Sequence, residues 1–295
     1  MTITAKSGNE DLLTTNEIQL VALDVDGTLV DHDGRMSDGV RETASAVVKS
    51  GRDVIIATGR SLGATLPIIQ MIGMTRGYCV CSNGAITLRI DTSLPDGYEV
   101  VSRVVFDPAP ALRALRERLP TAKYALENDK GEFLATERFQ DASFGAATNV
   151  VDFEQMMEAT AVRVVVFSTD SSAEEFGEVV GSIGLHGVTY SVGWTAWLDI
   201  AAAGVTKASA LEELRRHLEV DPSRTLAIGD GRNDIEMLGW AAQGVAMGQA
   251  PQEVMDAANA VTETVYDDGA ALVLQSLLKD GRVETDTADS SDDND

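Results

Sequence analysis

The sequence predicts an α/β protein in which a parallel sheet, covered by helices on both faces, is interrupted by a second domain of α+β type. Two observations support this prediction. Short, almost continuously apolar runs alternate with helical patterns towards both ends of the chain, which is typical of parallel strands buried on both faces. Between residues 88 and 200 this alternation stops, and strand-like runs outnumber helical ones.

The first part of the predicted sheet alternates strand and helix. Residues 18–25 form a strand pattern that ends in Asp-x-Asp-Gly. Ser37 is a suitable N-cap for a helix that ends just before Gly51. Pro67 lies inside the next helical pattern and predicts a kink or a break there. The elements expected in this part are strands at 18–25, 53–57 and 78–81 and helices at 37–49 and 62–72.

The later elements fall into two groups. After residue 200 the sheet pattern resumes, with helices at 207–218 and 235–242 and strands at 225–228 and 244–247. The middle of the chain holds strand-like runs at 98–106, 163–167, 188–192 and 196–200 around helical patterns at 109–119 and 173–183. Strand–helix–strand–strand, occurring twice, predicts an antiparallel sheet. We therefore expect a discontinuous core of residues 17–87 and 201–279 and an insert of residues 88–200.

Both ends of the chain are predicted to be unstructured. Residues 1–16 are mostly polar and are expected to form a flexible tail without the apolar segment of a secretory signal. Residues 280–295 carry seven acidic side chains and one arginine. With almost no large apolar residue, this segment cannot bury enough surface to offset its chain entropy, so we expect a disordered acidic tail.

Composition excludes several classes of function. The 295 residues include 23 Lys and Arg against 47 Asp and Glu, a formal charge of −24. This balance argues against partners such as nucleic acid or an anionic membrane surface. No apolar run approaches the length that spans a bilayer. The two cysteines, Cys79 and Cys81, are too close in sequence for an unstrained bridge, and we expect a reducing, cytoplasmic location.

Acidic residues follow two of the predicted strands. Because the carboxyl ends of parallel strands share one edge of a sheet, Asp24, Asp26, Asp230 and Asp234 are expected to converge there with Lys207. Two like charges about 4 Å apart repel by about 4 kcal/mol at an effective dielectric constant near 20. A divalent cation removes this repulsion, and ligands that are all oxygen favour Mg²⁺.

The same residues suit a phosphate monoester as substrate. Lys207, the Thr58 hydroxyl and loop amides could bind the phosphoryl oxygens that the cation leaves free. Asp24 and Asp26 lie two positions apart on an extended strand, so both can face one substrate. One carboxylate could attack phosphorus while the other protonates the leaving oxygen and later activates water.

Five motifs together resemble the haloacid dehalogenase superfamily and, within it, the Cof-like phosphatase branch. They are Asp24-Val25-Asp26-Gly27-Thr28-Leu29, Thr58-Gly59-Arg60, Ser82-Asn83-Gly84-Ala85, Gly204-Val205-Thr206-Lys207 and the run from Gly229 to Met237. The resemblance spans residues 18–279. It implies a Rossmann-like core, an inserted α/β cap that selects the substrate, Mg²⁺ as cofactor, and hydrolysis of a small phosphorylated metabolite, such as a sugar phosphate, through an aspartyl-phosphate.

The resemblance also implies residue roles. Asp24 would be the nucleophile and a Mg²⁺ ligand, and Asp26 the general acid/base, with its backbone carbonyl on the metal. Asp230 would be the third protein ligand, supported by Asp234. The phosphoryl oxygens would be held by residues of three motifs, namely Thr58, Gly59, Lys207 and Asn233. One departure from the branch is Asp199, where glutamate is commoner.

Some assignments stay open. Arg60, Asn83 and Gly84 are candidates for contacts with substrate or for a hinge, but Arg60 could equally be a structural ion-pair partner and Asn83 a turn residue. A phosphomutase of the same superfamily would return the phosphoryl group to substrate. Gly-x-Ser-x-Gly around Ser61 would suit a serine hydrolase, and an aspartate with acidic metal ligands would suit a receiver-like phosphoacceptor. The sequence leaves open a monomer or a homodimer.

Overall fold

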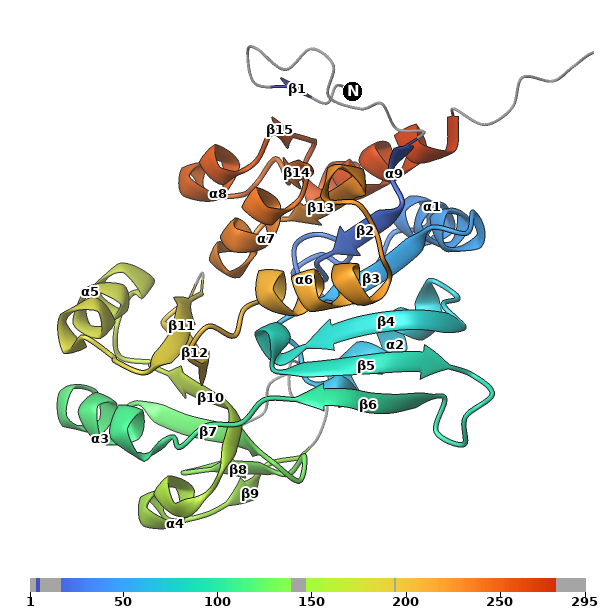
Figure 1. Ribbon diagram of the computed structural model, residues 1–295. Helices are drawn as coiled ribbons and strands as arrows, with labels where there is room; N and C mark the ends of the chain where they lie inside the picture. The colour runs from blue at the N-terminus through green and yellow to red at the C-terminus, as the bar shows by residue number, and fades with distance from the viewer. Residues whose placement is uncertain (1–3, 6–16, 139–146, 194, 280–295) are drawn as a thin grey trace, which may run out of the picture.

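The computed structural model describes residues 4–5, 17–138, 147–193 and 195–279, which form a nine-stranded and a six-stranded sheet (Figure 1). The predicted C-terminal tail at 280–295, and residues 1–3 and 6–16 of the predicted N-terminal tail, lie outside the described residues. Within the described ranges, no helix is both long enough and apolar enough to cross a membrane.

Six neighbouring strands of the large sheet run parallel; the sequence predicts five of them and misses the sixth, at residues 260–261. Their order across the sheet is β15-β14-β13-β2-β3-β4. These strands are β2 (Leu20–Leu23), β3 (Asp53–Ala57), β4 (Arg76–Cys81), β13 (Thr225–Gly229), β14 (Gln243–Ala246) and β15 (Ala260–Val261). The carboxyl ends of β2, β3 and β13 therefore meet at one edge of the sheet.

Antiparallel strands extend the large sheet on both sides. β5 (Ile86–Asp91) pairs with β4, and β6 (Tyr98–Arg103) pairs with β5. The expectation that the insert begins at residue 88 is corrected here, because the pairing of Cys81 with Ile86 forms a hairpin that keeps the chain in the core sheet. On the other side β1 (Thr4–Ala5) pairs with β15, so two residues of the predicted flexible tail form an edge strand.

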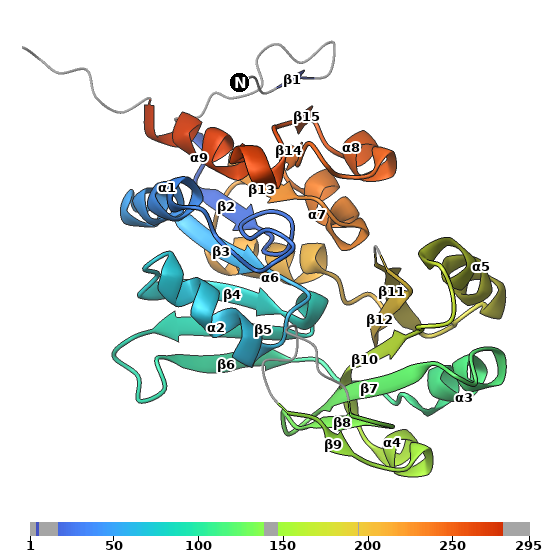
Figure 2. The ribbon, with the colours of Figure 1, turned by 180° about the vertical axis from the view of Figure 1, so that it is seen from behind.

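Helices cover both faces of the large sheet (Figures 1 and 2). One face packs against α1 (Asp38–Lys49), α2 (Leu62–Met71) and α9 (Gly269–Lys279), and the other against α6 (Lys207–His217), α7 (Ile235–Trp240) and α8 (Gln252–Ala257). The alternation within β2 explains this, since Val21 and Leu23 face the first layer and Leu20 and Ala22 the second. Of the kink or break predicted at Pro67, the break is excluded, because α2 continues through this residue, with the buried Ile68 and Ile69 packed against the sheet.

The six-stranded sheet belongs to the insert. Its strands, in the order β11-β12-β10-β7-β8-β9, are antiparallel except for β8 with β9. They are β7 (Lys123–Asn128), β8 (Phe133–Ala135), β9 (Asn149–Val150), β10 (Ala161–Phe167), β11 (Val188–Val192) and β12 (Trp197–Ala202). Figure 1 shows α3 (Ala109–Arg118), α4 (Phe153–Glu158) and α5 (Ala173–Ile183) on the side of this sheet away from the core.

The other face of the insert sheet is turned towards the core. Val164 and Val166 of β10 pack beneath the helices, whereas Val165 and Phe167 belong to the opposite face. Because side chains alternate along a strand, Arg163 shares this second face with Val165. The face that the insert turns towards the core thus carries the charged Arg163 beside the apolar Val165 and Phe167.

Candidate active site

Three buried carboxylates converge at the carboxyl edge of the core sheet. Asp24 follows β2, Asp230 follows β13, and Asp234 lies at the end of the 3₁₀ turn Arg232–Asp234. One oxygen from each side chain lies within 4.8 Å of the others. Because the carboxyl ends of parallel strands meet at one edge of the sheet, Asp24 and Asp230 come together although they are more than 200 positions apart in the chain.

Lys207 joins this cluster from the first turn of α6. Its buried Nζ lies 2.6 Å from Oδ1 of Asp24 and 2.7 Å from Oδ1 of Asp234. The second oxygen of Asp234 accepts the backbone N–H groups of Asp230 and Gly231, at 3.0 and 2.9 Å. Three carboxylates against one ammonium leave a formal charge of −2. Such a charge, on oxygen ligands alone, fits a hard divalent cation.

The pKa values of the cluster also indicate a site for a cation. Burial raises the pKa of Asp24 to about 7, and the charge of Asp234 adds to this effect. Burial and the neighbouring Asp24 raise the pKa of Asp230 to about 8. Burial would lower the pKa of Lys207, but Asp234 and Asp24 together raise it above its ordinary value. The protein alone thus favours the protonated forms of Asp24 and Asp230, and a cation beside them would favour their ionised forms.

Gly27 and Gln249 position Asp230. Gly27 has a φ of 79°, and a Cβ atom there would lie 2.0 Å from Oδ2 of Asp230, so only glycine allows this approach. Nε2 of Gln249 donates to the Gly27 carbonyl at 2.6 Å and to Oδ2 of Asp230 at 3.2 Å. Sequence reasoning missed Gln249. The available signal was its place just beyond the carboxyl end of a parallel strand, β14.

Asp26 lies apart from the buried cluster. Its carboxylate is exposed and accepts two close hydrogen bonds from Arg60, at 2.9 Å from Nε and 2.6 Å from Nη2. The side chain of Asp26 is therefore not one of the three converging carboxylates, and the metal contact expected through its backbone carbonyl stays a prediction. Arg60 thus forms an ion pair in the structure, and its contact with substrate stays a prediction.

Hydrogen bonds and close approaches position the remaining predicted residues. Thr58 is buried, and its hydroxyl accepts the backbone N–H of Arg60 at 3.1 Å. Nδ2 of Asn233 donates to Oδ1 of Asn83 at 2.9 Å. Gly84 has a φ of 106°, and a Cβ atom there would lie 2.3 Å from the carbonyl oxygen of Thr206. This close approach places the start of α6, and with it Lys207, against the turn after β4.

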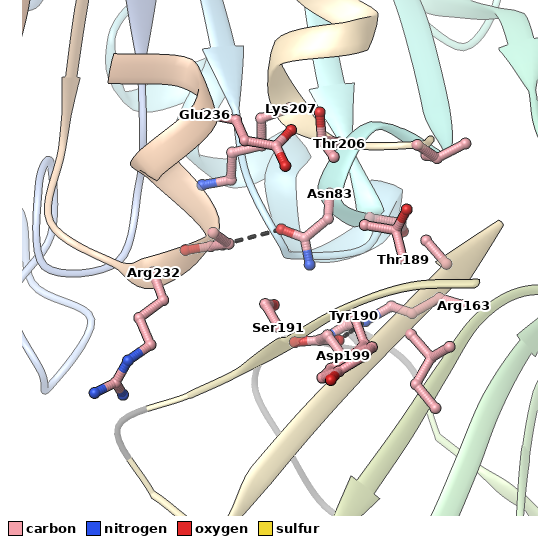
Figure 3. Close-up of a pocket in the computed structure, with 15 residues that line it drawn as sticks. Asn83, Arg163, Thr189, Tyr190, Ser191, Asp199, Thr206, Lys207, Arg232 and Glu236 are labelled. Carbon is pink, nitrogen blue, oxygen red and sulfur yellow. Dashed lines mark hydrogen bonds and ion pairs between the residues drawn. The ribbon is translucent and has the colours of Figure 1, made fainter. Parts of the chain in front are cut away.

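Two adjoining cavities lie between this edge and the insert, with volumes of about 360 and 80 Å³. The larger is lined by Asp24, Asp26, Gly59 and Asp230 from the core and by Arg163, Ser191 and Asp199 from the insert. Figure 3 shows the smaller one, with Asn83 and Lys207 on its core side and Tyr190 and Asp199 on its insert side. The insert residues in these walls were not predicted, because their positions depend on how the two sheets face each other.

A buried hydrogen bond connects the core to the insert. The hydroxyl of Ser82, in the turn after β4, donates to Oε2 of Glu127 on β7 at 3.0 Å. Burial raises the pKa of Glu127, while Ser82, Arg163 and Arg103 oppose the shift. Next to it, Nε of Arg163 lies 2.5 Å from Oδ1 of Asp199. The first of these contacts joins the insert sheet to the core, and the second joins two strands within the insert sheet.

Ser61 of the Gly-x-Ser-x-Gly motif is a helix cap in the structure. It is buried and its hydroxyl accepts the backbone N–H of Ala64 at the start of α2. Nε2 of His217 lies 2.9 Å from the Tyr78 hydroxyl, at the far end of α6. The motif that suggested a serine hydrolase is thus accounted for by local helix structure.

Comparison with known proteins shows the family of the chain. The family model of the haloacid dehalogenase-like hydrolases matches residues 21–274. The chain belongs to this family. The haloacid dehalogenase-like fold and the family predicted from the motifs are thereby confirmed, and the chain is an enzyme that falls among the phosphatases of the family.

Individual members show the same similarity. The hydrolase is 27% identical to a phosphoglycolate phosphatase of Methanoculleus marisnigri, over 85% of this chain and 93% of the relative. It is 27% identical to the 5-amino-6-(5-phospho-D-ribitylamino)uracil phosphatase YitU of Bacillus subtilis, over 88% of this chain and 97% of that relative. The solved structure of the subclass IIB sugar phosphatase BT4131 superposes with a TM-score of 0.71 at 26% identity, covering 87% of this chain and 98% of that one.

Proposed function

We propose that this hydrolase is a Mg²⁺-dependent phosphatase that cleaves a small phosphomonoester, such as a sugar phosphate, through an aspartyl-phosphate on Asp24. The observation that supports this most is the placement of Asp24. Its carboxylate lines the larger cavity while Lys207 holds one of its oxygens at 2.6 Å. A nucleophile fixed in this way needs little reorganisation to meet phosphorus.

In the first step, an oxygen of Asp24 bonds to phosphorus and the bond from phosphorus to the leaving oxygen breaks. Asp26, in its protonated form, gives its proton to that oxygen, so the leaving group departs as an alcohol. In the second step, Asp26 takes a proton from water as the water attacks the aspartyl-phosphate. Inorganic phosphate leaves and the Asp24 carboxylate is restored.

Both oxygens of Asp26 accept hydrogen bonds from Arg60 in the structure. We therefore expect this ion pair to open, at least at one oxygen, before Asp26 can transfer a proton. The pair lies at the cavity wall, where an entering substrate would compete for the Arg60 guanidinium. Arg60 would thus keep Asp26, the acid/base residue, in an ion pair until substrate binds.

Asp24, Asp230 and the backbone carbonyl of Asp26 are the proposed Mg²⁺ ligands. Bound there, the ion would neutralise the phosphoryl oxygens and withdraw charge from phosphorus. Asp234 is part of the same cluster, but its oxygens already accept from Lys207 and from two backbone N–H groups. We assign it to holding Lys207 and the loop after β13. Lys207, Thr58, Gly59 and Asn233 would surround the remaining phosphoryl oxygens.

The substrate proposal rests on the cavity and on the relatives. A total volume of a few hundred Å³ suits a small metabolite. The relatives include phosphatases of phosphoglycolate, of a phosphoribitylamino-uracil and of sugars. We propose that the insert acts as a cap that selects among such esters, and that the enzyme works in the cytoplasm, where the free thiols of Cys79 and Cys81 stay reduced.

The experiment that tests this function is trapping of the covalent intermediate. The Asp26→Asn variant is mixed with Mg²⁺ and an aryl phosphate, quenched in acid, and digested for mass spectrometry. We expect one phosphoryl group on the peptide that contains Asp24. Wild-type turnover should release inorganic phosphate and stop on addition of EDTA. Phosphate returned to a second hydroxyl of a sugar phosphate would indicate the phosphomutase instead, and phosphorylation elsewhere would contradict the proposal.

A further inference from the structure

The cationic side chains that line the two cavities are each paired with a carboxylate. Among the described residues these pairs are Lys207 with Asp24, Arg60 with Asp26, Arg232 with Glu253 and Arg163 with Asp199, at 2.5–2.6 Å. The proposed metal and Lys207 serve the phosphoryl end of a substrate. Whether the three arginines can bind the rest of the substrate then depends on how strongly each is paired with its carboxylate.

The pair of Arg163 and Asp199 is the firmest of those outside the acidic cluster. Its side chains are 3% and 16% exposed, against 41% and 51% for Arg232 and Glu253. The two residues stand on neighbouring strands, β10 and β12. The second oxygen of Asp199 accepts Nε1 of Trp197 at 2.8 Å. Figure 3 shows the pair on the insert side, across the cavity from Lys207 and Asn83.

This pairing decides the charge at the insert end of the cavity. A buried arginine facing a cavity would by itself attract a carboxylate or a second phosphate. With Asp199 at 2.5 Å its charge is cancelled locally, and Glu127 is a second nearby acid. The wall still offers polar atoms, because each carboxylate oxygen can accept a further hydrogen bond. An uncharged group with hydroxyls matches such a wall, whereas an anion would have to displace Asp199.

We propose that Asp199 is a specificity-determining residue: by neutralising Arg163, it makes the enzyme select esters whose leaving group is uncharged and hydroxylated over esters whose leaving group carries a carboxylate or a second phosphate. The proposal rests on the phosphatase function given above.

Two esters that differ in one group test this selectivity. Glycerol 3-phosphate carries a CH₂OH group where 3-phosphoglycerate carries a carboxylate. We expect wild-type kcat/KM to favour glycerol 3-phosphate by about tenfold or more. In Asp199→Asn, which keeps the size of the side chain and removes its charge, the ratio should move towards 3-phosphoglycerate by about tenfold. Asp199→Glu retains the charge and should keep the wild-type preference.

The ratio is taken within each protein, so a general loss of activity cancels. Equal wild-type use of the two esters overturns the proposal, as does an unchanged ratio in a folded Asp199→Asn protein. The wild-type ratio needs no variant and decides the matter even where a variant fails to fold. A wild-type protein that hydrolyses neither these esters nor an aryl phosphate would instead contradict the phosphatase function itself.

Discussion

The ammonium group of Lys207 lies 2.6 Å from a carboxylate oxygen of Asp24, a residue 183 positions earlier in the chain, and neither side chain is more than 5% exposed. Removing two such charges from water costs several kcal/mol, which their attraction repays only in good geometry. A cluster of three acids around one lysine is therefore a poor device for stability alone. It is suited to a site that gains a cation and an anionic substrate.

Replacement of Lys207 by methionine tests the electrostatic balance of this cluster. In EDTA, the variant should lose about 3–5 kcal/mol of unfolding free energy, because the buried carboxylates lose their cationic partner. Urea denaturation measures this loss, and Mg²⁺ should restore part of it. Lys49→Met, at an exposed position in α1, is the matched control and should stay near wild type. Equal stability of the two variants in EDTA would show that the cluster is not charged as described.

Stability of the metal-free protein should fall as the pH rises. The pKa values of Asp24 and Asp230 are raised to about 7 and about 8 in the folded state, from ordinary values near 4. The folded state thus binds more protons than the unfolded state across this interval, so these groups stabilise at low pH and lose that contribution as the pH passes from about 4 to about 8.

Thermal denaturation in EDTA at a series of pH values measures this effect. Asp230→Asn should flatten the dependence, whereas Asp33→Asn, at an exposed position, should leave it as in wild type. Mg²⁺ binds the ionised carboxylates, so its stabilising effect should be largest at the alkaline end. A wild-type profile that Asp230→Asn does not alter would argue against raised pKa values.

Gln249 should tune the affinity for the metal. Its side chain holds both the Gly27 carbonyl and Asp230, so Gln249→Leu frees the carboxylate to turn. Loss of such a supporting contact typically weakens metal binding by about 10–100-fold. The measurement is the Mg²⁺ concentration that gives half-maximal turnover of an aryl phosphate. Gln252→Leu, three positions on and exposed, is the control; if both variants need the same Mg²⁺ concentration, Gln249 does not support the site.

Ser82→Ala should destabilise the protein through the insert. The substitution leaves the buried Glu127 without its hydroxyl donor, which costs about 1–3 kcal/mol of unfolding free energy. Ser82 has a φ of 49°, but serine and alanine both carry a Cβ atom, so the backbone strain is similar in the two proteins. Urea denaturation compares the variant with Ser182→Ala, an exposed serine in α5. Wild-type stability of Ser82→Ala would mean that the bond to Glu127 contributes nothing.

The sequence predicts the parallel core because its strands are short, apolar and separated by well-capped helices. It predicts the convergence of Asp24, Asp230 and Lys207 because residues that follow parallel strands meet at the same edge of the sheet. It does not predict that 86–103 joins the core sheet, since the choice of partner for an antiparallel hairpin depends on the sheet beside it. Nor does it predict the pairs Asp26–Arg60 and Arg163–Asp199, which arise where separate loops and strands meet.

The central claim is that buried acids from both halves of the core gather around a divalent cation so that Asp24 can bond to phosphorus. A crystal structure with Mg²⁺ and beryllium fluoride, which mimics a phosphoryl group on a carboxylate, tests it most directly. We predict an ion between Asp24 and Asp230, with the fluoride complex bonded to Asp24 and contacted by Lys207. An ion bound elsewhere, or the mimic on any other side chain, would contradict it.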